Sequence, residues 1–160
     1  MSLTIGEENI TSTDEARNIG VTFDSHLSLV KHIRKTSKSA WFNIWNISKI
    51  RKFLDLDATK GLCHALVTSK LDFCNSLLLG TPDVHLKSLV KIQNASVRLI
   101  CGLKKDTRHI TPYIRNLHWL PLKFRIEFKI LLLVYKALKD QAPPYLKAYL
   151  KWYDPGRSLR

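Results

Sequence analysis

The stretch TPDVHLKSLVKIQNASVRLICG, residues 81–102, contains both the start and the stop signals of a long α-helix. Thr81 can cap the helix, Pro82 suits its first position, and Asp83 complements the positive end of the helix dipole. Gly102 suits the left-handed conformation that often follows the last helical residue. We therefore predict a helix over this stretch, and similar signals recur in the rest of the chain after residue 24.

The other predicted helices also begin at capping residues or at prolines. Ser28 and Asp57 are suitable N-caps for two helices before Thr81, and Gly80 is a suitable stop for the second of them. The predicted ranges are about 29–54 with a bend near Ser48, 58–79, a short helix from Thr111, 121–139 and 143–152, while 103–109 is a charged linker.

Apolar residues at helical spacing indicate which side of each helix is buried. On the first helix these residues are Ile33, Ala40, Trp41, Ile44 and Ile47. On the second they are Leu62, Ala65, Leu66, Phe73 and Leu77. The long helix after Pro121 is apolar on almost all sides from Ile130 to Tyr135, so we expect a core or a partner to cover it.

The first 24 residues are expected to form one β-hairpin. Leu3 and Ile5 alternate with polar residues, Ile19, Val21 and Phe23 do the same, and the polar residues 11–15 suit a turn. A single hairpin is only marginally stable in water, so this one needs a neighbour. The predicted fold class is therefore mainly α, a multi-helix bundle with an N-terminal β-hairpin. Its predicted regions are the hairpin (1–24), a helical region (25–102) and a C-terminal helical region (103–160).

The charge of the chain points to its partner. The net charge of the 160 residues is +13. Residues 1–24 hold five acidic side chains and one basic one, whereas the other 136 residues hold 25 basic and eight acidic ones. Binding a polyanion relieves the repulsion within such a basic body and releases counterions. We therefore expect RNA or DNA as the partner, although a merely solubilising surface has the same composition.

Composition also excludes several classes of protein. The longest apolar run, 130–135, is too short to cross a bilayer, and no apolar stretch follows Met1 as it does in a signal peptide. Cys63, Cys74 and Cys101 are odd in number and widely spaced, unlike a disulfide framework. We expect no membrane partner and a cytoplasmic or nuclear location.

The basic residues are spaced so that several of them share one helix face. Rows of positive charge match the phosphates of a nucleic acid and bind them without reading base sequence. The predicted contacts are Lys31, Arg34, Lys35, Lys38, Lys49, Arg51 and Lys52 on the first helix and Lys87, Lys91 and Arg98 on the third. Each row can also be only the polar face of an amphipathic helix, and Arg98 and Arg125 can instead be interior or interface arginines.

Four aromatic residues lie near the first basic row: Trp41, Phe42, Trp45 and Phe53. Exposed aromatic rings can stack on unpaired bases, but such residues more often pack in a core. We expect Trp41 to be buried and leave Trp45 open between the two roles.

No catalytic, cofactor-binding or metal-binding pattern stands out. Cys63 and His64 are adjacent, so on a helix they diverge by about 100° and do not face one ion. No cysteine pair has the C-x₂-C spacing of a zinc site. Asp72 lies among apolar residues and is expected to pair with Lys70 or a buried arginine. His118-Trp119 is expected to hold a hydrogen bond between the two helical regions.

Several separated blocks resemble, in the same order, the C-terminal part of the reverse transcriptase polyprotein of non-LTR retrotransposons (LINE elements) of the jockey-like and chicken-repeat-like kind. The blocks are Gly20-Val21-Thr22-Phe23-Asp24 with Leu27-Ser28 and His32-Ile33, Leu71 to Leu78, Ile92 to Ala95, and His109 to Leu146, which includes the stretch from Asn116 to Ile130.

This resemblance implies that 1–24 correspond to the end of the polymerase palm and that 25–102 form the thumb, which holds the RNA–DNA template–primer duplex. The paired aspartates that bind catalytic metal in that family have no counterpart here. The resemblance thus implies a fragment of an RNA-directed DNA polymerase that is not itself an enzyme and needs no cofactor. The missing palm or a second copy would cover the hairpin. The alternative is a non-catalytic helical protein-interaction or structural module with no nucleic-acid role.

Overall fold

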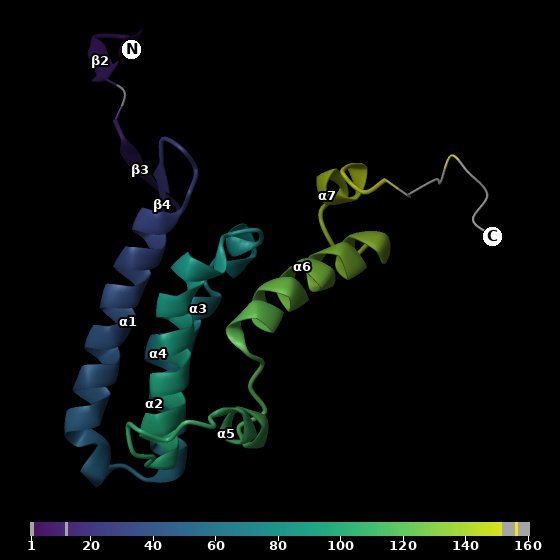
Figure 1. The fold of residues 1–160 in the computed structure, drawn as a ribbon. Helices are drawn as coiled ribbons and strands as arrows, with labels where there is room; N and C mark the ends of the chain where they lie inside the picture. Colours follow the sequence, from purple (N-terminus) through teal and green to yellow (C-terminus); the bar gives the residue numbers. More distant parts are fainter. Residues whose placement is uncertain (1, 12, 152–155, 157–160) are drawn as a thin grey trace.

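The computed structural model describes residues 2–11, 13–151 and 156, and within them the fold is mainly helical, as predicted. Figure 1 shows the order of the elements along the chain. Two antiparallel strand pairs come first: β1 (Ser2–Ile5) with β2 (Glu8–Thr11), and β3 (Glu15–Asn18) with β4 (Val21–Asp24). The helices are α1 (Val30–Ile50), α2 (Leu56–Cys63), α3 (Ser69–Asp72), α4 (Asp83–Cys101), α5 (Thr111–Asn116), α6 (Leu122–Leu138) and α7 (Pro144–Ala148).

The prediction of a single N-terminal hairpin is wrong, because the chain forms two short ones. Ile5 pairs with Glu8 across one tight turn, and Asn18 pairs with Val21 across the other. Each turn contains a glycine with positive φ, +62° at Gly6 and +85° at Gly20. Two-residue hairpin turns require positive φ, which glycine adopts without strain. These local turns therefore replace the longer loop that was expected at residues 11–15.

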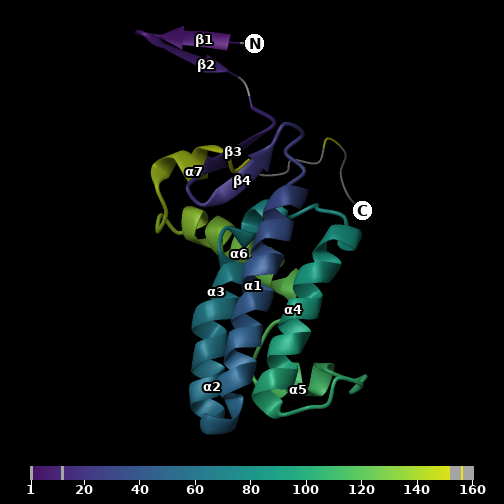
Figure 2. The same ribbon diagram turned by 90° about the vertical axis from the view of Figure 1, so that its left-hand side faces the viewer.

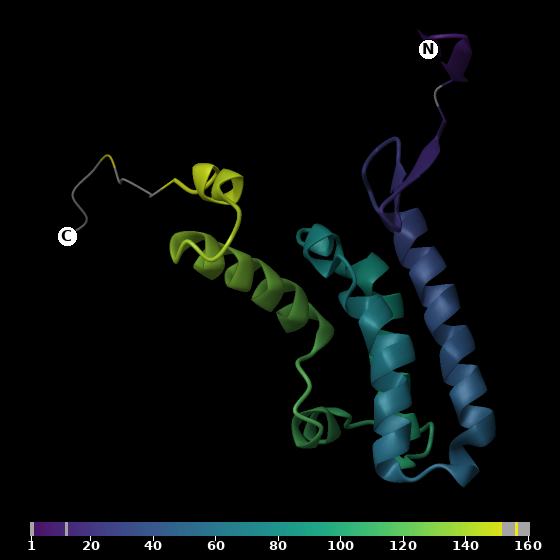
Figure 3. The ribbon, with the colours of Figure 1, turned by 180° about the vertical axis from the view of Figure 1, so that it is seen from behind.

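The core lies between α1, the α2–α3 segment and α4. Figure 1 shows α1 on one side of the α2–α3 segment and α4, Figure 2 shows α1 in front of them, and the view from behind in Figure 3 shows the α2–α3 segment beside α1. Helix α2 also contacts α4 directly. The predicted buried residues Ile33, Ala40, Ile44 and Ile47 of α1 are confirmed. The prediction that Trp41 is buried is wrong, since 44% of its surface is exposed. It lies at the edge of the contact between α1 and α4 rather than inside it.

The boundaries of α1 and α4 are close to the predicted ones. Helix α1 continues as a 3₁₀ turn, Arg51–Phe53, rather than bending near Ser48. Leu29 (φ +58°) occupies the N-cap position of α1 in place of Ser28, whose hydroxyl accepts a long hydrogen bond (3.4 Å) from the backbone N–H of Val30. Helix α4 ends at Cys101, and Gly102 follows it with φ +63°, as predicted.

The second predicted helix differs in its cap, its length and its buried side. Its N-cap is Asp55, not Asp57, and the Asp55 carboxylate accepts a 2.7 Å hydrogen bond from the backbone N–H of Ala58. A π-helical segment, His64–Thr68, joins α2 to α3, and a 3₁₀ turn, Asn75–Leu78, follows the left-handed Cys74.

The π-helical segment explains which residues of this region are buried. A π turn holds more residues than an α turn, so the inward side recurs every four residues, at Thr59, Cys63, Val67 and Leu71. The predicted inward residues Ala65, Leu66, Phe73 and Leu77 are exposed instead, and only Leu62 packs against the core.

Helix α6 is attached to the bundle at its N-terminal end and leans away from it, carrying α7 (Figures 1 and 3). The predicted pairing of Asp72 with a buried arginine is confirmed, because Arg125 of α6 forms a two-bond ion pair with it. Residues 130–135 were expected to be covered by a core or by a partner; burial in the core is wrong, since Leu131 is 66% and Tyr135 55% exposed, and cover by a partner stays a prediction. The predicted extension of α7 to Trp152 falls outside the described residues.

Gln93 of α4 holds the segment that leads into α6. Its side-chain amide donates a 2.8 Å hydrogen bond to the carbonyl of Leu120 and accepts a 2.9 Å hydrogen bond from the N–H of Leu122. The side chains of His118 and Trp119 form no hydrogen bond within the described residues, so the bond expected from them between the two helical regions is not found. Gln93, Arg98 and the Arg125–Asp72 pair make such bonds instead. His118 adopts a left-handed turn (φ +56°), and Trp119 packs against both parts of the core.

Candidate nucleic-acid interface

The outer face of α1 carries a row of cations and aromatic rings. Alternating steps of four and three residues place its members along one line of the helix. The row consists of Lys31, Lys35, Lys38, Phe42, Trp45 and Lys49, all of them exposed. We call it the α1 row. At 1.5 Å per residue it is about 27 Å long, enough to lie along several successive phosphates of a duplex. Helix α1 contains no acidic residue, and Arg34 is exposed beside the row.

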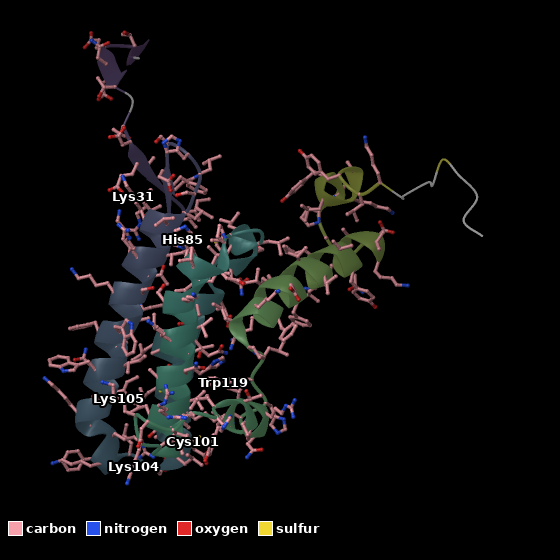
Figure 4. The ribbon with its side chains drawn as sticks, viewed as in Figure 1. Lys31, His85, Cys101, Lys104, Lys105 and Trp119 are labelled. Carbon is pink, nitrogen blue, oxygen red and sulfur yellow. The ribbon has the colours of Figure 1, made fainter. Side chains whose placement is uncertain are left out.

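The loop before α1 fixes the position of the first lysines of the row. The Asp24 carboxylate accepts hydrogen bonds from the backbone N–H groups of Ser28 (3.0 Å) and His26 (3.1 Å) and from the Ser28 hydroxyl (3.0 Å). These bonds, with that from the Ser28 backbone the largest cause, lower the pKa of Asp24. The loop thereby holds β4 against α1, and Figure 4 shows Lys31 next to this hairpin.

Glu15 of β3 is the acidic neighbour of this row. Its carboxylate lies 3.6 Å from Nζ of Lys31 and 3.3 Å from Nζ of Lys35. The hydrogen bond from Lys35, followed by the charge of Lys35, lowers the pKa of Glu15. The three side chains are well exposed, so solvent and salt screen both ion pairs. Phosphates can therefore compete with Glu15 for the two lysines.

The predicted residues near the end of α1 differ in role. Lys49 lies over the Trp45 ring, with Nζ 3.4 Å from the ring centroid, and Lys52 lies over Phe53 at 4.8 Å. Arg51 instead donates to three backbone carbonyls, those of Leu99 (3.0 Å), Ile100 (3.2 Å) and Leu54 (2.8 Å). Two of these lie in the last turn of α4, so Arg51 satisfies carbonyls that lack helical partners. Arg51 joins α1 to α4.

The structure brings three of the predicted residues together in a groove of about 770 Å³ between α1 and α4, which we call the Trp41 groove. Its cations are Arg51, Lys91, Arg98 and Lys105, and no carboxylate lines it. Apolar side chains form most of the remaining lining, namely Trp41, Ile44, Ala95, Leu99 and Leu103, and Ser48, Asn94 and Gly102 complete it. The groove is therefore an apolar trough with positive charge around it.

The cations of the Trp41 groove differ in their burial and in the bonds that they already form within the protein. Arg98 is half-buried; its Nη2 donates to the Thr107 carbonyl at 3.2 Å, while its buried Nε has no partner among the described residues. Lys91 and Lys105 are exposed and form no ion pair within the described part of the chain. Figure 4 labels Lys105 on the loop that follows α4. Lys87 is exposed one turn before Lys91 but lies outside this groove.

A second cavity, of about 620 Å³, lies where β3 and β4 meet α1 and α3. Arg17, Lys35 and Lys70 line it together with hydroxyl side chains, again without a carboxylate. His32 also lines it, and its Nδ1 accepts a long hydrogen bond (3.4 Å) from the backbone N–H of Thr22. Burial, and then the charge of Lys35, lowers the pKa of His32, so the imidazole is neutral at neutral pH.

Two observations concern the metal-binding and nucleophilic side chains. The described residues contain no cluster of three or more His, Cys, Asp or Glu side chains suited to a metal ion. Burial raises the pKa of Cys63 to about 11, which keeps its thiol protonated and unreactive. No helix in the described part of the chain is both long and apolar enough to span a membrane.

Comparison of the chain with protein-family models, curated proteins and solved structures finds no match. The arrangement of the residues themselves is therefore the basis for assigning a function. Sequence reasoning identified most cations of this surface, but it missed Lys105 and the place of Phe42 and Trp45 in the α1 row. The alternating spacing of four and three residues was the signal for the row, whereas nothing in the sequence indicates that Lys105 lies beside Trp41.

Proposed function

We propose that this chain is a non-catalytic binder of nucleic acid that holds an RNA–DNA duplex without reading its sequence, in the manner of a polymerase thumb. The observation that carries the proposal is the α1 row: exposed cations at both ends of a helix that has no acidic residue. Lysines on a straight helix can contact successive phosphates, and such contacts supply sequence-independent affinity. The resemblance to the non-LTR reverse transcriptases supports the same assignment.

Charge reversal of the first turns of α1 tests this function. We expect the variant Lys31→Glu, Arg34→Glu, Lys35→Glu and Lys38→Glu to lose most of the affinity for an RNA–DNA hybrid, at least about tenfold at low salt. The slope of log K against log salt should become shallower by about three to four, since each phosphate contact contributes roughly one unit. Fluorescence anisotropy of a labelled hybrid, titrated at several salt concentrations, measures both quantities.

A charge-matched variant on α6 and the residues beside it is the control: Lys123→Glu, Lys129→Glu, Lys136→Glu and Lys139→Glu. All four are exposed, and the variant changes the net charge by the same amount. If the two variants weaken binding equally, net charge rather than the α1 row determines affinity. An unchanged affinity and salt slope in the α1 variant refutes the proposal, provided that circular dichroism shows a folded protein.

A helical protein-interaction module is the second candidate function, and the exposed apolar residues of α6 favour it. Phe124 and Phe128 are each 53% exposed, in addition to Leu131 and Tyr135. Contiguous apolar residues at a surface are typical of contacts between proteins. Binding of nucleic acid through the α1 row does not involve these apolar side chains of α6, whereas binding of another protein would cover them.

A further inference from the structure

We infer that the Trp41 groove binds an unpaired nucleotide of a single strand, with the base on the Trp41 ring and the phosphates at Lys91 and Lys105. This inference rests on the proposed function and extends it. The α1 row would contact the phosphate backbone of a duplex, whereas the groove would bind a base. A base offers its flat face to a protein ring only when it is not stacked within a duplex.

The shape and lining of the groove carry the inference. Its volume of about 770 Å³ lies within the range of ordinary small-molecule sites. Trp41 is 44% exposed although it lies beside the buried contact between α1 and α4, so part of its indole is open to a ligand. The aliphatic side chains Ile44, Ala95 and Leu99 provide an apolar surface near it. A planar aromatic ligand packs on such an apolar surface better than a flexible polar ligand does.

The polar groups of the groove select an anionic ligand with hydrogen-bonding edges. Lys91 and Lys105 bring positive charge from α4 and from the loop after it, and no carboxylate in the lining neutralises them. Asn94 presents an amide that can both donate and accept hydrogen bonds, as base edges require. Arg98 adds a half-buried cation to the lining of the groove. A base with its attached phosphates combines these properties.

The experiment compares a blunt RNA–DNA hybrid with the same hybrid that carries an unpaired extension of about six nucleotides. We expect the wild-type chain to bind the extended hybrid on the order of tenfold more tightly, the effect of stacking one base. Trp41→Ala should abolish this preference and leave the affinity for the blunt hybrid unchanged. Trp41→Phe, which keeps a ring, should retain part of it.

Phe42→Ala is the matched control, because Phe42 is the next residue of α1, is exposed and does not line the groove. It should retain the preference for the extension. The inference is overturned if the wild type shows no preference, if Trp41→Ala keeps it, or if both alanine variants lose it equally. Failure of the proposed function would give a different result. The wild type would then bind the blunt hybrid weakly, and the charge-reversal variant of α1 would bind it with the same affinity.

Two competitors distinguish other occupants of the groove. Polyglutamate at equal charge concentration should not displace the extended hybrid, since it has no ring to place on Trp41. Free ATP at an equal nucleotide concentration should not displace it either, because one nucleotide makes fewer contacts than a strand. Displacement by polyglutamate would assign the groove to acidic peptides, and displacement by ATP to free nucleotides; either result overturns the inference.

Discussion

At the scale of single residues, Glu15 is an acidic side chain that competes with phosphates for two lysines of the α1 row. It lies within ion-pair distance of Lys31 and Lys35, two members of the α1 row. Both pairs are exposed, so solvent and salt screen them and they stabilise the fold only weakly. Glu15 therefore contributes little to folding, but a phosphate that approaches the two lysines must displace it.

We predict that Glu15→Gln tightens binding of the RNA–DNA hybrid about threefold, the combined value of two weak exposed pairs. The pKa of Glu15 lies below its ordinary value of 4.5, so the carboxylate is charged and competes above that pH. As the pH falls through the lowered pKa, Glu15 becomes neutral and the difference between variant and wild type should vanish. Anisotropy titrations at neutral pH measure the effect.

Glu8→Gln provides the control for net charge. Glu8 is exposed in β2 and forms no ion pair within the described residues, so its replacement changes the same charge without freeing a lysine. Equal tightening by the two variants would show that the overall charge, not the release of Lys31 and Lys35, determines affinity.

At the scale of elements, two polar contacts attach α6 to the bundle. Gln93 of α4 is 2% exposed and bonds both the carbonyl of Leu120 and the N–H of Leu122. Arg125 of α6 pairs with Asp72 of α3. Buried polar groups of this kind cost little when paired and much when one partner is removed. They therefore fix where α6 leaves the bundle.

We predict that Gln93→Ala lowers the free energy of unfolding by about 2 kcal/mol, because it leaves two backbone groups of the α6 start without partners. Chemical denaturation followed by circular dichroism measures this change. Gln141→Ala removes the same side chain at an exposed position and should change stability by less than about 0.5 kcal/mol. Equal effects of the two substitutions would contradict the role given to Gln93.

At the scale of the whole molecule, basic and apolar residues share the exposed surface. The acidic excess lies in residues 1–24, basic residues are spread over the rest of the chain, and α6 exposes apolar side chains next to its own lysines. Repulsion among the basic groups keeps copies of the chain apart at low salt. Salt screens that repulsion but does not weaken apolar contacts.

We predict that the chain self-associates through α6 as salt is raised, and that Leu131→Gln with Tyr135→Gln restores the monomer. Light scattering with and without RNA measures the mass. Leu27→Gln, at a 69% exposed position in the loop before α1, is the control and should leave association unchanged. A dimer at every salt concentration that ignores RNA would favour the protein-interaction function over nucleic-acid binding. A monomer at every salt concentration would contradict the role given to α6.

Local signals determined much of this protein. The stop of α4 at Gly102, the starts of α5 and α6 near their prolines and the inward residues of α1 other than Trp41 followed from prolines, glycines and helical spacing, since these act within a few residues of the chain. The cations of the α1 row could be predicted for the same reason. The predicted cap at Thr81 is wrong, because Pro82 occupies the N-cap position of α4 and no side chain caps that helix. The two hairpin turns also depend on local signals, the glycines Gly6 and Gly20, but the prediction placed a single turn at residues 11–15.

Tertiary structure alone decided the features that join distant residues. The π-helical segment shifts the buried side of α2 and α3, and Asn43 of α1 supports it by donating a 2.7 Å hydrogen bond to the carbonyl of Leu66. Trp41 is exposed because the contact between α1 and α4 ends beside it, and Lys105 reaches the same groove from 64 positions further along the chain. Helical spacing shows which side of a helix is apolar, but packing against other elements determines how far that side is covered.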